Sequence, residues 1–331
     1  MHRLTLALAI ALCLGFTSGI VAQNVMPEPP QLERKIALGN VSGRIDHMAV
    51  DLAHHRLFVA ELGNNTVGVV DLEAQKVVHR LSGLKEPQGV GYVQPSDSLY
   101  VANGGDGSVR VFRGTEYSAS GRIDLGADAD NIRVDLPGNR LLVGYGSGGI
   151  GVIELRRNNK LESFPLKAHP ESFQFDAGSR QIFVNLPNNH AIAVVDATTG
   201  QQRATWSMPH GANFPMALDP DRQRVLAVFR SPPKFAAFDW QTGALVSEAD
   251  TCGDADDVFL DSKRQRIYII CGAGFVDVLR ADDAKYSRLA KIATIAGART
   301  GLFVADMDRL FVAARAQSGQ PASIWVYRTA P

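Results

Sequence analysis

A polar residue recurs at seven equivalent places along the chain, and four of the seven are carboxylic acids. The set is spaced 41–44 residues apart: Asp46, Gln88, Asp130, Glu171, Asn213, Asp256 and Thr300. Oxygen donors gathered at one place suit a hard cation such as Ca²⁺. The expected ligands of a divalent cation are the four acids of the set, Asp46, Asp130, Glu171 and Asp256. Crowded carboxylates also raise one another's pKa, which general acid–base chemistry can use.

Residues beside this set add further donors. His47, Asn131 and Asp257 directly follow three of its members, and Arg230 lies in a loop expected on the same side, where it could hold an anionic group. Imidazoles such as His47, His169 and His210 would favour a transition metal over calcium. The alternative is structural, because the same side chains could line a water-filled channel and bond neighbouring repeats. The sequence leaves both interpretations open.

A repeat of about 42 residues must position these side chains. It consists of an apolar stretch, an Asp, a polar turn, an Arg, a second apolar stretch and a Gly/Asn turn, and is clearest at 48–72. The centres of the second stretches lie 41–43 residues apart, at Val59, Val101, Val143, Val184, Ala227, Ile269 and Val312. A period of about 40–50 residues rich in short strands is typical of β-propeller blades. The sequence therefore predicts an all-β, seven-bladed propeller of four-stranded antiparallel blades.

The ends of the chain indicate how the ring closes. The last repeat lacks a fourth strand, whereas an extra strand-like stretch, Leu32–Leu38, precedes the first repeat. We expect this stretch to complete the last blade, because closure removes exposed sheet edges. The predicted organisation is a signal peptide at 1–22, a flexible lead-in at 23–31 and one propeller domain at 32–331.

The Asp and Arg shared by most repeats have a structural explanation. In the first repeat, Asp51 ends one strand and Arg56 opens the next, so the Asp can accept backbone N–H bonds within the turn. We expect the Arg to pair with that Asp. Recurrence at one structural position favours turn construction over catalysis.

The first 22 residues predict export. A short basic start precedes an apolar run at 4–15 that is too short to span a bilayer, and cleavage is expected near Ala22. The mature protein is therefore expected in the periplasm or secreted. An oxidising compartment permits a disulfide between Cys252 and Cys271, which share one repeat, but two separate thiols remain the alternative.

Composition excludes several classes of function. The 331 residues carry 34 basic and 34 acidic side chains, so no basic surplus favours nucleic acid. No segment after the signal peptide is apolar enough to cross a membrane, and a monomer is expected. The chain has no C-x-x-C-H for covalent haem, no G-x-S-x-G, no H-E-x-x-H and no Trp that recurs per blade. No resident cofactor is expected, apart from a divalent cation such as calcium.

The sequence Leu99–Asn103 (LYVAN), with its following Gly-rich turn and Val-rich strand, resembles the bacterial YVTN repeat. The chain is similar to the YVTN-repeat (YncE-like, cytochrome-d1/lactonase-type) seven-bladed propellers. That resemblance implies the fold but not one activity, since the wider group contains lactonases, lyases, oxidoreductases and proteins without known activity. Two functions stay open. The first is binding of a small molecule or periplasmic protein at the channel mouth, and the second is a metal-dependent lactonase or lyase that uses the acidic ring.

Overall fold

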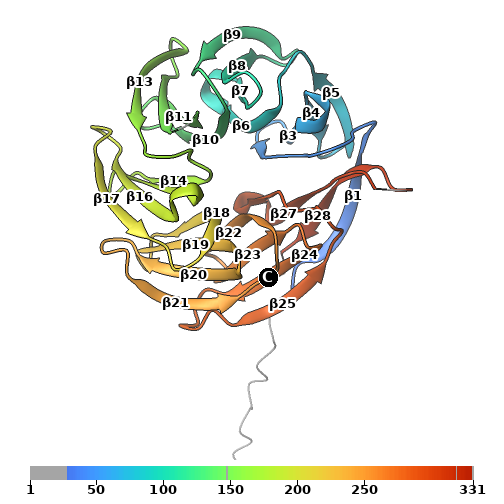
Figure 1. Cartoon of the computed structure of the whole chain (residues 1–331). Helices are drawn as coiled ribbons and strands as arrows, with labels where there is room; N and C mark the ends of the chain where they lie inside the picture. The colour runs from blue at the N-terminus through green and yellow to red at the C-terminus, as the bar shows by residue number, and fades with distance from the viewer. Residues whose placement is uncertain (1–27, 147, 318, 330–331) are drawn as a thin grey trace, which may run out of the picture.

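The computed structural model describes residues 28–146, 148–317 and 319–329. Its strands form seven four-stranded antiparallel sheets arranged in a ring (Figure 1). The chain is a seven-bladed β-propeller, as the 42-residue repeat predicts. The expected signal peptide at 1–22 lies outside the described residues, as does most of the expected lead-in.

Each of the first six blades is built from four consecutive strands. Blades 1 to 3 are β2 (Met48–Asp51), β3 (Arg56–Glu61), β4 (Thr66–Asp71) and β5 (Lys76–Leu81); β6 (Pro87–Val93), β7 (Ser98–Asn103), β8 (Ser108–Arg113) and β9 (Ser118–Asp124); and β10 (Ala129–Asp135), β11 (Arg140–Tyr145), β12 (Gly149–Glu154) and β13 (Asn159–Pro165). Blades 4 to 6 are β14 (Phe173–Asp176), β15 (Gln181–Leu186), β16 (Ala191–Asp196) and β17 (Gln202–Ser207); β18 (Gly211–Asp219), β19 (Arg224–Ser231), β20 (Pro233–Asp239) and β21 (Leu245–Asp250); and β22 (Ala255–Asp261), β23 (Arg266–Cys271), β24 (Phe275–Arg280) and β25 (Arg288–Ala293).

The seventh blade joins the two ends of the chain. It combines β26 (Gly301–Val304), β27 (Arg309–Ala314) and β28 (Ala322–Arg328) with β1 (Gln31–Gly39), and β1 lies beside β28 in Figure 1. Ile36 pairs with Ile324 across the closing strands and is 1% exposed. It packs in an apolar cluster with Leu57 of blade 1 and Phe311 of blade 7. Closure by the N-terminal strand is therefore confirmed.

Apolar clusters between neighbouring blades hold the ring together. Phe58 and Val69 of blade 1, for example, pack against Val90 and Leu99 of blade 2. The middle strands of these blades are buried on both faces, which explains why they read as continuous apolar runs rather than alternating ones. The first strands of neighbouring blades contact one another around the axis, so residues at the start of each first strand face a shared channel.

Helical structure in the described residues consists of four short 3₁₀ turns. They are η1 (Leu62–Asn64), η2 (Gln94–Ser96), η3 (Pro187–Asn189) and η4 (Ala305–Met307). Within these residues no helix has the length and apolar character needed to cross a bilayer.

The recurring Asp and Arg build turns, with one correction to their pairing. Asp51 Oδ1 accepts the N–H groups of Ala53 and His54 at 3.0 and 3.3 Å, as expected. Arg56, however, pairs with Asp71 rather than Asp51. Arg56 lies opposite both residues, but the oxygens of Asp51 already bond the N–H groups of Ala53 and His54 and the His54 ring. Asp135 and Arg140 do form the expected pair, at 2.8 Å.

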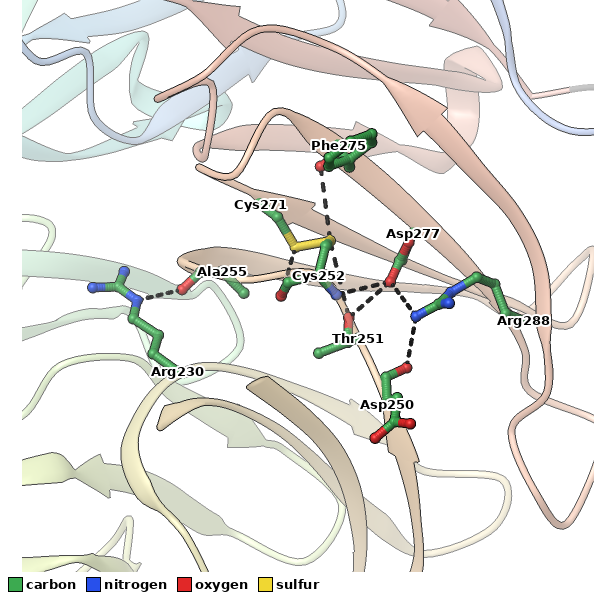
Figure 2. Close-up of a disulfide and its surroundings, with 9 residues drawn as sticks. All are labelled: Arg230, Asp250, Thr251, Cys252, Ala255, Cys271, Phe275, Asp277 and Arg288. Atoms are coloured by element: carbon green, nitrogen blue, oxygen red, sulfur yellow. Dashed lines mark hydrogen bonds and ion pairs between the residues drawn. A yellow bond between two sulfur atoms is a disulfide. The ribbon is translucent and has the colours of Figure 1, made fainter. Parts of the chain in front are cut away.

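A disulfide ties the loop between blades 5 and 6 to strand β23 (Figure 2). It joins Cys252 to Cys271, whose Cα atoms are 5.9 Å apart, and both residues are buried. The N–H of Cys252 donates to Asp277 Oδ2 at 2.9 Å, and Arg288 donates to the same oxygen at 2.9 Å. The covalent link and the buried carboxylate fix the loop that leads into β22, where Asp256 and Asp257 lie.

Candidate functional site

A polar cavity of about 610 Å³ opens at one end of the central channel. Its walls are formed where loops enter the first strand of each blade and where second strands end. The lining includes five carboxylates and three arginines, namely Asp46, Asp128, Asp130, Glu171, Asp256, Arg44, Arg230 and Arg299. The carboxylates outnumber the arginines, so the cavity favours a positively charged guest.

Three side chains of this wall converge as a candidate metal site. Asp130, His169 and Glu171 each offer one ligand atom, and these atoms lie within 4.8 Å of one another. Asp130 is 6% exposed, and its Oδ1 has no hydrogen-bond partner among the described residues. A buried carboxylate oxygen without a partner is costly. A cation bound in the cavity would satisfy it.

Main-chain hydrogen bonds position the other two members of this cluster, His169 and Glu171. Nδ1 of His169 lies 2.5 Å from the carbonyl oxygen of Gly146. Because a carbonyl only accepts, Nδ1 carries the proton and Nε2 keeps the lone pair that a metal requires. The main chain of Glu171 is fixed on both sides, since its N–H donates to Asn185 O at 3.1 Å and its C=O accepts from Asn131 Nδ2 at 3.0 Å.

Arginines neutralise the other acids of the predicted ring. Asp256 pairs with Arg230 through Oδ1 and with Arg299 through Oδ2, the latter at 3.0 Å. Asp46 pairs with Arg44 at 2.8 Å. Guanidinium groups hold both oxygens of Asp256 and one oxygen of Asp46, and neither acid belongs to the three-residue cluster. This differs from the expectation that all four acids act as ligands.

Burial shifts the carboxyl groups of the cluster towards their protonated forms. Desolvation raises the pKa of Asp130 well above its ordinary value, although the nearby His47 opposes the shift. Desolvation also raises the pKa of Glu171, and His169 opposes it. A bound cation would reverse this trend, because its charge stabilises the ionised carboxylates.

His47 lies at the inner end of the cavity, among three carboxylates. Its Nε2 is 3.8 Å from Asp46 and 3.9 Å from Asp130, and its Nδ1 is 3.8 Å from Asp257. Burial lowers the pKa of His47, but the surrounding carboxylates, Asp257 first, outweigh it and raise the pKa overall. Burial raises the pKa of Asp257 to about 7, against the opposing effect of His47.

The remaining predicted residues divide between the cavity and the framework. Gln88 lines the cavity and donates to Asp128 at 3.2 Å, and Asn131 also lines it. Asn213 and Thr300 lie outside the lining. The amide of Asn213 bonds to Asn185 and to the Ala191 carbonyl, and the hydroxyl of Thr300 donates to the Ile45 carbonyl at 3.1 Å. At these two positions the observed contacts fit the alternative interpretation, in which the polar side chain has a structural role.

Sequence reasoning gave too little weight to two residues. His169 was grouped with His47 and His210 and not placed among the expected ligands, yet it converges with Asp130 and Glu171. Arg133 was not singled out, although a charged residue in the otherwise apolar stretch after Asn131 was a usable signal. Of the other imidazoles, His210 pairs with Glu248 at 2.5 Å and does not line the cavity.

Comparison with known proteins identifies similarity in fold alone. No family model matches the chain, and no curated protein matches it in sequence. The structure is similar to a chain of Kuenenia stuttgartiensis hydrazine synthase, with TM-score 0.75 and 16% identity over 96% of this chain and 99% of that one. It is also similar to a chain in a crystal structure of the mitotic checkpoint complex, with TM-score 0.76 and 15% identity over 99% of both chains. At these identities the likeness shows a seven-bladed propeller and no particular activity.

Proposed function

We propose that this protein binds a small polar molecule at the channel mouth, around a divalent metal ion held by Asp130, His169 and Glu171. The observation that carries the proposal is the convergence of these three side chains about the unpartnered Oδ1 of Asp130. Three protein ligands on one wall leave coordination positions open toward the cavity, where water or a ligand can bind.

The donor set indicates the class of metal. One imidazole and two carboxylates suit Zn²⁺, Mn²⁺ or Fe²⁺ better than Ca²⁺, which prefers six to eight oxygen ligands. This choice replaces the calcium-like ion expected from the acidic ring alone. The paired arginines opposite the cluster give the bound molecule a second polar wall, and Arg230 also lies over the Phe214 ring at 3.7 Å from its centroid.

Metal content and metal binding test the proposal. Protein purified without chelators should contain up to one equivalent of a transition metal by elemental analysis. In calorimetric titrations with Zn²⁺ or Mn²⁺, Asp130→Asn should lose binding, while the matched variant Asp256→Asn should keep it, because arginines already neutralise Asp256. Wild-type protein that is metal-free and shows no saturable binding of these ions would contradict the proposal.

A metal-dependent hydrolase or lyase is the second candidate function. It is favoured by His47, which reaches the cavity beside Asp130 and could accept a proton there. In lactone hydrolysis, water adds to the ester carbonyl, the ring C–O bond breaks and the leaving oxygen takes up a proton; a bound metal would polarise the carbonyl. The test is release of acid from γ- and δ-lactones by wild type and His47→Gln. Hydrolysis no faster than in buffer would leave binding as the function.

The finer family assignment and the compartment belong to the same proposal. The LYVAN sequence at Leu99–Asn103 supports membership of the YVTN-repeat propellers, and the apolar run at 4–15 supports export to the periplasm. Fractionation of cells that express the full chain, with N-terminal sequencing of the product, tests cleavage near Ala22.

A further inference from the structure

A second cavity, of about 540 Å³, lies on the other side of His47 and Asn131, which line both spaces. It reaches the opposite end of the channel, because Leu52 and Asp306, which follow the ends of two first strands, form part of its rim. Much of its wall is apolar: Met48, Val50, Val90, Ile132, Val134, Phe259 and Phe303. This space is separate from the candidate metal cluster.

One guanidinium group faces this largely apolar space. Arg133 is partly buried on β10, where its Nε donates to Gln174 Oε1 at 3.2 Å and its Nη1 donates to the Ile132 carbonyl at 2.8 Å. Gln174 is itself oriented, because its Nε2 donates to the Met216 carbonyl at 2.8 Å. The Phe173 ring lies against the guanidinium, 5.4 Å from its centre. The group is therefore held in place before any ligand arrives.

No carboxylate among the described residues lies in direct contact with Arg133. It forms no ion pair within 4 Å there and its Nη2 makes no hydrogen bond, while Asp257 and Asp130 act on it from a longer range. The acids of the same cavity are directed elsewhere. Asp257 accepts the Gly301 N–H at 2.8 Å and faces His47, while Asp306 is exposed at the rim.

A positive charge in this setting is incompletely compensated. Burial lowers the pKa of Arg133, and the attraction of Asp257 and Asp130 opposes this shift without cancelling it. Guanidinium groups bind carboxylates through two parallel N–H···O bonds, and a pre-oriented group loses little entropy in doing so. The apolar wall around it would receive the hydrocarbon part of the same molecule.

We propose that this second cavity, called the lower cavity below, binds a small carboxylic acid with an apolar chain. The carboxylate would lie on Arg133 and the chain against the apolar wall. The site differs from the one at the channel mouth in position and in chemistry, since one takes a cation and the other an anion. The proposal therefore stands or falls independently of the proposed metal site.

Titration of the full protein with sodium octanoate tests this proposal, with octan-1-ol as the uncharged probe. Wild type should bind octanoate saturably with one site and prefer it to the alcohol. Arg133→Met should weaken octanoate binding about tenfold or more, the effect of losing a charge-assisted pair, and Arg133→Lys should recover part of it. Ala49→Phe adds a ring to the cavity lining from β2, a different first strand from that of Arg133, and should weaken both probes.

Arg44→Met serves as the matched control, because it removes an arginine that lines the channel mouth and does not line the lower cavity. Octanoate affinity should be the same in this variant as in wild type. The proposal is overturned if wild type shows no saturable octanoate binding, or if Arg133→Met binds octanoate as wild type does. Loss of octanoate binding in Arg44→Met alone would place the carboxylate at the channel mouth and also overturn it.

Discussion

Nδ1 of His169 lies 2.5 Å from the carbonyl oxygen of Gly146, and this contact fixes which ring nitrogen can bind a metal. The two residues come from loops on the same side of the propeller and both line the cavity. A backbone carbonyl behind a histidine is a common support for a metal ligand, because it selects the tautomer and holds the ring. It gives His169 a role that no other imidazole in the described residues shares.

The first prediction compares two histidines of similar exposure. His169→Ala should weaken Zn²⁺ or Mn²⁺ binding about a hundredfold, because it removes one of three ligands. His210→Ala should leave metal affinity unchanged, since His210 pairs with Glu248 away from the cavity. Their side chains are 18% and 20% exposed, so simple burial does not distinguish them. Equal metal affinity in both variants, measured by calorimetry, would exclude His169 as a ligand.

The second prediction concerns the pH dependence of stability. Asp257 has a pKa of about 7 in the folded protein, above its ordinary value near 3.9. The folded state therefore binds more protons between these values, so the contribution of Asp257 to stability is fully present at low pH and is lost as pH rises through 7. The raised pKa of His47 acts in the same direction, because its contribution is also lost as pH rises.

Asp257→Asn should remove most of the pH dependence of stability that Asp257 causes. The free energy of unfolding of wild type should fall between pH 5 and pH 8 by about 2–3 kcal/mol more than that of the variant. The asparagine oxygen can still accept the Gly301 N–H, so the local fold is kept. Urea unfolding at both pH values, in the presence of EDTA, measures the difference. Parallel pH profiles for the two proteins would show that Asp257 titrates normally.

The third prediction tests closure of the ring. Ile36→Ala should lower the free energy of unfolding by about 2–4 kcal/mol, because it opens a cavity in the cluster between blades 7 and 1. Leu32→Ala on the same strand is the control, with a change below about 0.5 kcal/mol expected since Leu32 is 45% exposed. Similar melting of Ile36→Ala and wild type would mean that β1 contributes little to closure.

The fold could be predicted from sequence because the same pattern of apolar stretches and turns recurs seven times, about 42 residues apart. Val59 and Val101, for example, were identified as centres of second apolar stretches and lie on the second strands β3 and β7. The closing strand was predictable for a similar reason. One strand-like stretch precedes the first repeat, and the last repeat lacks its fourth strand. Pairing of Arg56 with Asp71 was not predicted, because it depends on His54 and the turn N–H groups occupying the oxygens of Asp51.

The candidate site was less predictable, because the repeat locates positions but not partners. Asp130, Asp256 and Thr300 occupy equivalent places, yet the first has an oxygen without a hydrogen bond, the second is held by two arginines and the third bonds a backbone carbonyl. Those outcomes depend on which loop residues of other blades lie opposite. Arg230 reaches Asp256 from 26 residues away in sequence, a contact that no local pattern indicates.

The most direct test of the central claim is a crystal structure of the protein with Mn²⁺ or Zn²⁺ and anomalous data collected at the absorption edge of the metal. We predict a single strong anomalous peak within bonding distance of Asp130, His169 and Glu171. The peak should be absent from crystals of Asp130→Asn treated in the same way. A peak beside Asp46 and Asp256 instead, or no peak in the channel mouth of the wild type, would contradict the account.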